Sequence, residues 1–291
     1  MKNKFDAYKK QILKNMIICN LFGKKKLIMK YYEQMTGRTY DFDNPKTFIE
    51  KLNTRKASTD KLLTRCCDKV AVREYVKEKI GEEYLIPEYF VADKLTSKLY
   101  DDMPNQCVLK TASGSGTIEI IYDKEKCNKK EIIKLMREYQ KVMFHYVWGE
   151  MFYKHVKNRI ICEKLLLTEE GKVPVDYKIH CFRNGGKPKY FIEIDFDRFG
   201  DHRRNYYDEK FELLDLQELH PNYEGKVQKP KNWDKLLEVA KKLSEDFDYV
   251  RVDLYSFEEK VYFGELTFCH NAAFSKFNPE KWNVEFGKYF K

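Results

Sequence analysis

The stretch "QCVLKTASGSGTIEIIYD", residues 106–123, decides how this chain is interpreted. The apolar residues that end at Lys110 predict a strand, the Gly/Ser segment 113–116 predicts a flexible loop, and the alternation over 117–121 predicts a second strand. Glycines let backbone N–H groups approach an anion closely, and a neighbouring ammonium neutralises its charge. The stretch therefore indicates either a phosphate-binding loop or an ordinary hairpin with a flexible tip.

The order of residues in this stretch excludes two familiar nucleotide loops. A Walker loop carries its lysine after the glycines and leads into a helix, and a dinucleotide-binding fingerprint also opens a helix. Here Lys110 precedes the glycines and a strand follows them. Protein kinases carry His-Arg-Asp and Asp-Phe-Gly tripeptides, and neither occurs in this sequence. What remains is a nucleotide loop of another design, or a loop that binds no nucleotide.

Length and composition predict a folded protein with a substantial core. The chain has 291 residues, of which 43% are hydrophobic and 15% aromatic, and it contains no internal repeat or low-complexity segment. Its eight cysteines include no Cys-x-x-Cys pair, so we expect reduced core cysteines in a cytoplasmic protein. The histidines show no zinc-binding spacing.

The net charge is concentrated at the N-terminus. Residues 1–30 contain nine lysines and one acidic residue, Asp6, so they carry +8 of the formal charge of +9. The nearly neutral remainder argues against a nucleic-acid partner. Apolar residues at helical spacing predict that this basic segment either lies on an anionic membrane at its inner face or docks on its own domain. No apolar run is long enough to span a bilayer, and no signal-peptide cleavage site follows.

The periodicity of the remaining chain predicts an α+β protein with antiparallel sheets. Helices are expected from Asn44 to Leu52, from Asp68 to Ile80, from Lys129 to Trp148 and from Trp233 to Asp246. The second half is expected to consist mostly of strands, with one hairpin at 176–194 and another at 249–268.

The last predicted hairpin carries charges inside its strands, in "YVRVDLYSFEEKVYFGELTFCHN", residues 249–271. A period of two places Arg251 and Asp253 on one face of the first strand, and Glu265 and Thr267 on one face of the second. If the strands pair through residues 256–259, Asp253 and Glu265 can converge on one ion. Carboxylate oxygens suit Mg²⁺ held against phosphates. The alternative is a pair of solvated surface charges.

The order of these features resembles the ATP-grasp superfamily and, more narrowly, its TupA-like branch, which is associated with teichuronopeptide and surface-polysaccharide synthesis. The resemblance covers residues 40–268 or more. It is carried by the linked motifs NPKTFIEKLN, DKVAVREYV, GEEYLIP, VLK followed by the Gly/Ser loop, DYK, DRF with HRRNYYD, FDYVRVDLY and VYFGELTF.

This resemblance implies an ATP-grasp fold, preceded by a basic helical segment at 1–40. The expected divisions are an N-terminal subdomain at 41–105, a small subdomain with the Gly/Ser loop at 106–165, and a C-terminal subdomain with the metal hairpin at 166–291. The implied cofactors are ATP and Mg²⁺.

The resemblance also implies roles for individual residues. Lys69 and Lys110 would hold the ATP phosphates, and the backbone of Ser113, Gly114, Ser115 and Gly116 would cover them. Glu163 would meet the adenine amino group, and the backbone of Lys164 and Leu166 would line the adenine edge. Lys178 would be a further phosphate contact, and Asp253 and Glu265 would bind Mg²⁺. Arg251 would stabilise the transferred phosphoryl group.

Two positions depart from the superfamily pattern. Thr267 stands where an asparagine usually follows the metal-binding glutamate, and residues 269–273, Cys-His-Asn-Ala-Ala, replace a segment that usually contains glycine. These departures put a third metal contact and the C-terminal substrate loop in question.

The expected reaction is carboxylate–amine ligation through an acyl phosphate, in which the protein positions substrates and stabilises charge. The acceptor would be a glycan or sugar carboxylate, and the donor an amino acid or another amine. A carboxylate needs cations, and a short turn-rich segment supplies Arg198, His202, Arg203 and Arg204; such a segment can also be a solvated loop. The alternatives are an ATP-grasp kinase for a sugar or small molecule, and a non-catalytic binding protein with the same fold.

Overall fold

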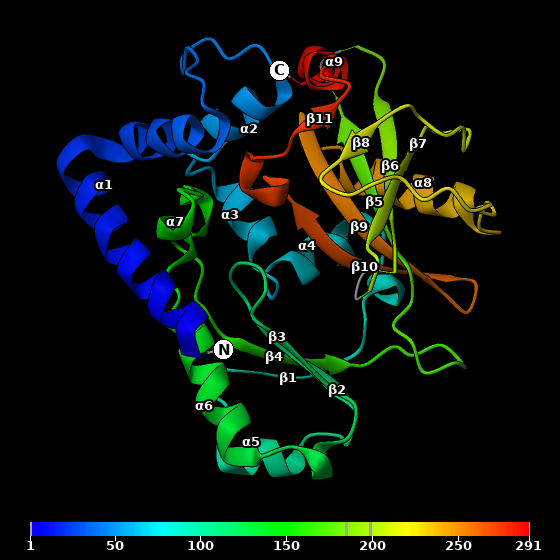
Figure 1. Cartoon of the computed structure of the whole chain (residues 1–291). Helices are drawn as coiled ribbons and strands as arrows, with labels where there is room; N and C mark the ends of the chain where they lie inside the picture. The colour runs from blue at the N-terminus through cyan, green and yellow to red at the C-terminus, as the bar shows by residue number, and fades with distance from the viewer. Residues whose placement is uncertain (1, 184–185, 198–199, 291) are drawn as a thin grey trace. The chain divides into compact units, whose positions relative to one another are not determined.

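The computed structural model describes residues 2–183, 186–197 and 200–290, with side chains from residue 8 onward. The chain forms two compact units. Unit 1 comprises Met1–Ile28, Lys56–Tyr75 and Ile86–Val173, and unit 2 comprises Met29–Arg55, Val76–Leu85 and Pro174–Lys291. Each unit contains an antiparallel sheet, labelled in Figure 1. The subdomain boundaries expected from the sequence stay predictions.

Unit 1 is built on a four-stranded sheet of order β1-β4-β2-β3. Its strands are β1 (Glu88–Ala92), β2 (Cys107–Thr111), β3 (Ile118–Ile121) and β4 (Ile160–Lys164). Its helices and helical turns are α3 (Lys61–Cys67), α5 (Ser97–Asp102), η2 (Lys124–Lys126), α6 (Lys129–Gln140), α7 (Phe144–Val147) and η3 (Met151–Tyr153).

One face of this sheet is apolar and packs on helices. Leu109 and Cys162 are fully buried in a cluster with Met136 of α6 and Tyr100 of α5, and Figure 1 shows α5 and α6 on one side of the sheet. Because side chains alternate along a strand, Val108 and Lys110 project from the opposite face. The face that carries Val108 and Lys110 is therefore available for polar contacts.

The expected single helix from Lys129 to Trp148 is wrong. Helix α6 ends at Gln140, and the separate helix α7 follows. Val142, Phe144 and Val147 are all buried in one cluster with Ile12 of the N-terminal helix. In a continuous helix, residues 142 and 144 would point about 200° apart around the axis. The break therefore lets both side chains enter the same core.

Unit 2 is built on a five-stranded sheet of order β10-β9-β5-β6-β7 and a small sheet of order β11-β8. The strands are β5 (Asp176–Phe182), β6 (Lys189–Phe196), β7 (Arg203–Tyr207), β8 (Gln217–Glu218), β9 (Tyr249–Phe257), β10 (Lys260–Thr267) and β11 (Phe277–Asn278). The helices and helical turns are α2 (Phe48–Arg55), η1 (Glu82–Tyr84), α8 (Trp233–Leu243), η4 (His270–Ala273) and α9 (Lys281–Tyr289).

The large sheet of unit 2 also has two unlike faces. Ile179, Cys181 and Val252 are buried on the side of α8, where the Cys181 thiol lies 3.9 Å from the carbonyl oxygen of Ala240. The other face ends in an aromatic cluster that contains Phe48 of α2 and Phe286 of α9. Beyond that cluster, the same face is lined with charged side chains.

Helix α1 (Lys2–Thr36) and helix α4 (Val72–Lys79) contribute residues to both units. The prediction of an N-terminal helix is confirmed, although Gly23 interrupts α1 with φ 81° and ψ 165°. Among the described helices, none is both long and apolar enough to cross a membrane. All eight cysteines are free, as expected, and six of them are buried.

Candidate active site

The Gly/Ser stretch of unit 1 forms the connection between β2 and β3, as the sequence predicts. The hydroxyl oxygens of Thr111 and Thr117 lie 2.7 Å apart across its base, and the Ser113 amide donates to the Asn158 side chain at 3.0 Å. Gly114 has φ +76°, and an added Cβ would lie 2.2 Å from the Phe144 ring. Only glycine fits at position 114, because both the backbone and the space exclude a side chain.

Two lysines flank this loop within unit 1. Lys69 donates its backbone amide to the Ala112 carbonyl at 3.0 Å, and its ammonium donates to the Gly114 carbonyl. Lys110 projects from the face of β2 opposite the helices, and its Nζ lies 2.5 Å from Glu163 Oε2. The second carboxylate oxygen of Glu163 lies 3.4 Å from Arg73 Nη1. Four predicted nucleotide-binding features, Lys69, Lys110, the loop and Glu163, therefore occur together in this unit.

The predicted adenine-edge residues follow directly on β4. The backbone amide of Lys164 donates to the Pro87 carbonyl at 2.9 Å, and Leu166 is buried. On the face that carries Lys110, Ile118 keeps 46% of its surface exposed, while Val108 and Ile120 are half-buried. This combination of an apolar surface and a charged pair is suited to a flat, polar-edged ligand.

In unit 2, the hairpin of β9 and β10 pairs Asp253 directly with Glu265. The pairing depends on a bulge between Phe263 and Glu265. Without the bulge, the register of Phe263 with Leu254 would place Glu265 opposite Val252, and the two carboxylates would lie on opposite faces. Gly264 occupies the bulge, where an added Cβ would lie 3.0 Å from the Asp253 carbonyl oxygen.

The two carboxylates already have partners on this face. Arg251 donates to Asp253 through Nε at 2.8 Å and through Nη2 at 2.7 Å. Thr267 donates its hydroxyl to Glu265 at 3.0 Å. Burial raises the pKa of Asp253 to about 6, against the opposing effect of the Arg251 charge. An ion bound here would therefore displace or share the Arg251 contact.

The donor chemistry of this pair fits magnesium. Across the described ranges, no group of three or more His, Cys, Asp or Glu side chains is arranged to hold a metal. Mg²⁺ does not require such a cage, because it retains several waters and is usually bound by one or two carboxylates plus phosphate oxygens. Asp253 and Glu265 meet that requirement.

Lys178 lies beside these residues in a buried ion cluster. Its register partner on β9 is Asp253, and its Nζ lies 2.9 Å from Asp176 and 2.7 Å from Asp195. Burial lowers the pKa of this ammonium, but Asp176 and the neighbouring carboxylates outweigh burial and raise the pKa overall. Lys178 is thus a fixed cation on the face that carries the predicted metal ligands.

Glu193, on the next strand, joins this cluster to a second arginine. Its Oε1 lies 2.9 Å from Arg204 Nη2, and its Oε2 lies 3.1 Å from His180 Nε2. Arg204 also contacts Asp195 at 2.7 Å and Glu218 at 3.2 Å. Hydrogen bonds and these charges lower the pKa of Glu193 well below its usual range despite its burial.

The predicted substrate cations lie in different environments. The expectation of a turn-rich loop is corrected at Arg203 and Arg204, which begin strand β7. Arg204 is 6% exposed and surrounded by carboxylates. Arg203 Nη2 lies 2.8 Å from Asp201 Oδ2. The His202 ring stacks on the His220 ring, with 3.6 Å between the ring centroids. Arg198 lies outside the described residues. A substrate role for the four stays a prediction.

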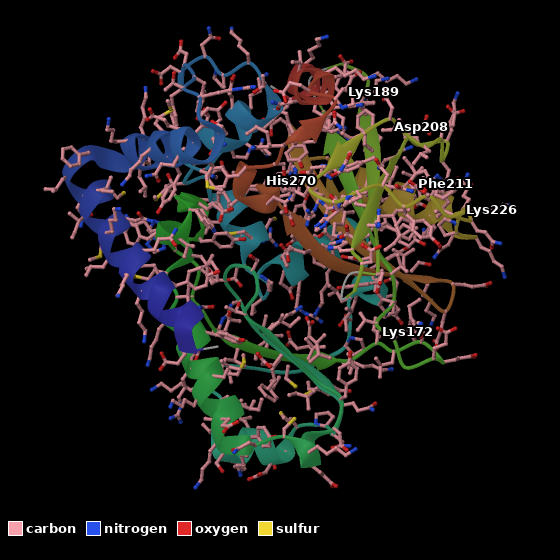
Figure 2. The ribbon with its side chains drawn as sticks, in the orientation of Figure 1. Lys172, Lys189, Asp208, Phe211, Lys226 and His270 are labelled. Atoms are coloured by element: carbon pink, nitrogen blue, oxygen red, sulfur yellow. The ribbon has the colours of Figure 1, made fainter. Side chains whose placement is uncertain are left out.

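Two histidines extend the cluster toward the segment after β10. The Tyr249 hydroxyl lies 3.0 Å from His180 Nδ1 and 3.2 Å from His270 Nδ1, while His270 Nε2 lies 3.1 Å from Glu218. Figure 2 labels His270 on this orange segment. Burial lowers the pKa of His180 to about 4, so the ring is neutral at pH 7.

Sequence reasoning did not assign the residues that bind this network together, namely His180, Glu193, Asp195, Glu218 and His270. The alternation in "DYKIHCF" and "YFIEIDF" offered a signal, since polar side chains recur there at every second position of two apolar strands. Glu218 and His270 had no comparable signal, because they belong to a two-residue strand and a short turn.

The segment after the hairpin adopts an unusual backbone. Asn271, Ala272 and Ala273 have φ values of 48°, 50° and 58°, a left-handed conformation that costs roughly 1–2 kcal/mol for each L-residue. The Asn53 side chain donates to the Ala273 carbonyl at 2.8 Å, and Asn271 donates to Glu218 at 3.2 Å. Side-chain hydrogen bonds thus hold a turn in which glycine would be expected.

The sequence that forms these arrangements also matches a known protein family. A family model described as TupA-like ATPgrasp matches residues 49–291. The chain belongs to the TupA-like ATP-grasp family. The match includes the Gly/Ser loop, both lysines beside it, and the paired carboxylates of the hairpin. It confirms the ATP-grasp fold expected from the sequence.

Solved structures with similarity to this TupA-like protein are distant. The D-alanine–D-alanine ligase from Helicobacter pylori is 13% identical with a TM-score of 0.43, and the alignment covers 78% of this chain and 61% of that one. The phosphoribosylamine–glycine ligase from Thermotoga maritima is 13% identical with a TM-score of 0.42, covering 83% and 65%. The chain therefore spans less than two thirds of these proteins. A search of the curated proteins found no match.

Proposed function

We propose that this TupA-like protein is a Mg²⁺-ATP-dependent ligase that joins an amine to a carboxylate through an acyl phosphate. The carboxylate oxygen would attack the terminal phosphorus of ATP and release ADP. The amine would then attack the acyl carbon, releasing phosphate and forming an amide. In this scheme the protein needs no side-chain nucleophile. Its task is to orient the reactants and stabilise negative charge.

The nucleotide would be held by residues of unit 1. Lys69 and Lys110 supply two cations for the phosphates, and the backbone of residues 113–116 supplies N–H donors. Glu163 would give up part of its ion pair with Lys110 and accept a hydrogen bond from the adenine amino group. The apolar side chains of Val108, Ile118 and Ile120 support this assignment, since they offer a surface against which a base can lie.

The charged face of unit 2 would organise the reacting groups. Asp253 and Glu265 would hold Mg²⁺, which when bound neutralises phosphate charge. Arg251 would turn from Asp253 toward the transferred phosphoryl group, and Lys178 would add positive charge nearby. The excess of carboxylates on the described part of this face supports a cation site. Six carboxylates outnumber three cations there. The carboxylates are Asp176, Glu193, Asp195, Glu218, Asp253 and Glu265, and the cations are Lys178, Arg204 and Arg251.

The substrates would come from the cell envelope. The family association favours a carboxylate on a surface polysaccharide or its precursor as acceptor, and an amino acid or other amine as donor. His202 and Arg203 remain candidates for binding the acceptor carboxylate, because both retain exposed surface and Arg204 does not. We expect the reaction to take place in the cytoplasm, on a polysaccharide precursor, because ATP is available there.

The observation that carries the proposal is the bulge that sets Glu265 opposite Asp253 in a TupA-like chain. The test compares Asp253→Asn, Glu265→Gln and Lys110→Met with the surface variant Glu212→Gln. The two metal variants should lose at least about a hundred-fold in ATP turnover while keeping their fold. Lys110→Met should lose most of the thermal stabilisation by Mg²⁺-ATP, which amounts to about 2.7 kcal/mol at a hundred-fold excess over Kd.

Glu212→Gln should behave as the parent in both measurements. A parent without any Mg²⁺-ATP-dependent shift would refute the nucleotide assignment. Mass spectrometry of the envelope glycan, with and without the protein, would identify the product. An amide-linked substituent that disappears with the protein supports the ligase, whereas a lost phosphoester would indicate a kinase instead.

A further inference from the structure

One side of helix α1 docks on unit 1 over the residues whose side chains are described. Ile12 is buried among Val142, Phe144 and Val147, and the Asn15 side-chain amide donates to the Tyr146 carbonyl at 2.5 Å. After the interruption at Gly23, Leu27 and Ile28 are fully buried. The docked helix, one of the two alternatives that the sequence left open, is therefore present.

The opposite side of the same helix carries large apolar residues into solvent. Leu13, Ile17 and Leu21 expose 57%, 51% and 70% of their surface. Their spacing of four residues aligns them in one row. Lys10 and Lys14 fall within the same third of the helix circumference and are also exposed. We call this row and its two lysines the outer stripe.

Unit 1 carries further exposed basic residues, after the outer stripe in the chain and on the neighbouring helix α6. Phe22 exposes 67% of its surface, and the exposed Lys24 and Lys26 follow it. Lys9 lies 3.4 Å from Glu138 of α6, so α1 lies beside α6. The exposed residues of α6 and of the position after it are mostly basic, namely Lys130, Lys134, Arg137 and Lys141.

We propose that the outer stripe binds an anionic lipid bilayer, with Leu13, Ile17 and Leu21 inserted at the headgroup boundary and the lysines among the phosphates. Interfacial helices combine such apolar rows with lysine in this way, and each lysine near an anionic surface contributes about five-fold in affinity, equivalent to about 1 kcal/mol. The docked side of α1 stays on unit 1. This inference goes beyond the proposed ligase activity.

Charge decides between a lipid surface and a second copy of the chain. A symmetric contact between two outer stripes would bring together two helix surfaces that both carry positive charge. Such a contact would bury the apolar row, which is favourable, but it would also bring like charges together, which is unfavourable. An anionic bilayer suits both the apolar row and the lysines, because its headgroups neutralise the lysines while its acyl boundary accepts the apolar side chains.

The test uses the full chain and vesicle sedimentation with phosphatidylcholine, with or without phosphatidylglycerol. The parent should bind only the anionic vesicles and be released by salt. The variant Lys10→Gln/Lys14→Gln should bind about twenty-five-fold more weakly, and Leu13→Gln/Ile17→Gln/Leu21→Gln at least about ten-fold more weakly. Matched controls in unit 2, Lys226→Gln/Lys276→Gln and Leu213→Gln/Leu219→Gln/Val284→Gln, should bind as the parent does.

Absence of parent binding to anionic vesicles would overturn the proposal, as would an equal loss in the controls. Light scattering without lipid provides a second arm. A dimeric parent that becomes monomeric in the apolar triple variant would identify the outer stripe as a self-association surface and overturn lipid binding. If circular dichroism shows that the triple variant does not fold, vesicle binding by the variant Lys10→Gln/Lys14→Gln tests the proposal instead. ATP turnover in solution should be the same in parent and variants, which separates this test from that of the ligase.

Discussion

The two large sheets share one plan and differ in how they hold charge. Each packs an apolar face on helices and carries charged side chains on the other. In unit 1, Lys110 and Glu163 form a small cluster beside a glycine-containing loop. In unit 2, carboxylates, a lysine, arginines and a histidine contact one another across β9, β5, β6 and β7. The charged pair of the first face keeps some contact with water, whereas most charged groups of the second face are buried against one another.

This difference follows from burial. The side chains of Lys110 and Glu163 retain 15% and 7% of their exposure, so water can replace a lost partner. Glu193 and Glu218 have none, and a buried charge without a partner is costly. The buried charged groups of unit 2 therefore hold one another in place, a condition that in enzymes favours electrostatic stabilisation.

The largest effect should come from Glu193→Gln. The substitution leaves Arg204 and Arg251 with one fewer carboxylate in a buried site, and breaking such a pair costs about 3–5 kcal/mol. The equivalent change in unit 1, Glu163→Gln, should cost only about 1–2 kcal/mol, because Lys110 and Arg73 can reach water. Urea unfolding followed by circular dichroism measures both.

The exposed Glu212→Gln serves as the control, with an expected change within about 0.5 kcal/mol. Equal costs for the two buried variants would contradict the contrast between the sheets. A Glu193→Gln variant as stable as the parent would show that the contacts of unit 2 are not mutually dependent.

A second effect concerns pH and His180. Its pKa is lowered to about 4 in the folded protein, against about 6.5 in an unfolded chain. The folded state thus favours the neutral ring, and this contribution is present above pH 6.5 and lost as pH falls toward 4. The unfolding free energy of the parent minus that of His180→Gln should decrease by about 3 kcal/mol over that window.

Taking the difference cancels the carboxylates that both proteins share, including Glu218, whose pKa is lowered to about 2. His155→Gln, at an exposed position, is the matched control for replacing a histidine with glutamine. A difference that stays constant between pH 6.5 and 4 would mean that His180 already carries a proton in the folded protein.

The smallest effect tests the loop of unit 1. Gly114 and Gly116 have similar φ values of +76° and +71°, but only Gly114 faces the Phe144 ring, and nothing lies within 4 Å of a Cβ at Gly116. Gly116→Ala should cost about 1 kcal/mol from the backbone alone. Gly114→Ala should cost about 2 kcal/mol or more because the ring must also move. Thermal unfolding distinguishes them, and equal costs would mean that Phe144 gives way freely.

Much of this fold was predictable because it depends on local alternation. The strands around the Gly/Ser loop and the hairpin that carries Asp253 follow directly from period-two patterns. The break before α7 was not predictable, since it depends on Ile12, more than a hundred residues away. The sequence indicated that Asp253 and Glu265 converge, but the bulge at Gly264 that brings them opposite each other became visible only with the register.

The candidate site was predictable to a smaller extent. Lys69, Lys110 and Glu163 belong to motifs, and they occur in one unit as expected. Arg204 appeared to be a surface cation, because its neighbours in sequence are polar, yet strand β7 turns it toward Glu193 and Asp195. Whether a charged side chain faces solvent or a buried carboxylate is decided by tertiary contacts that no local pattern contains.

The turn at residues 271–273 has a consequence for recognising distant relatives. A motif written in letters looks for glycine here, and a chain that reads Asn-Ala-Ala is scored as lacking the loop. The backbone nevertheless occupies the left-handed region that glycine adopts most readily, so residue letters alone do not reveal its dihedral angles. Comparisons of such loops by φ and ψ would group proteins that comparisons by residue type separate. They would treat glycine, asparagine and alanine as equivalent at these positions and exclude valine, isoleucine and threonine.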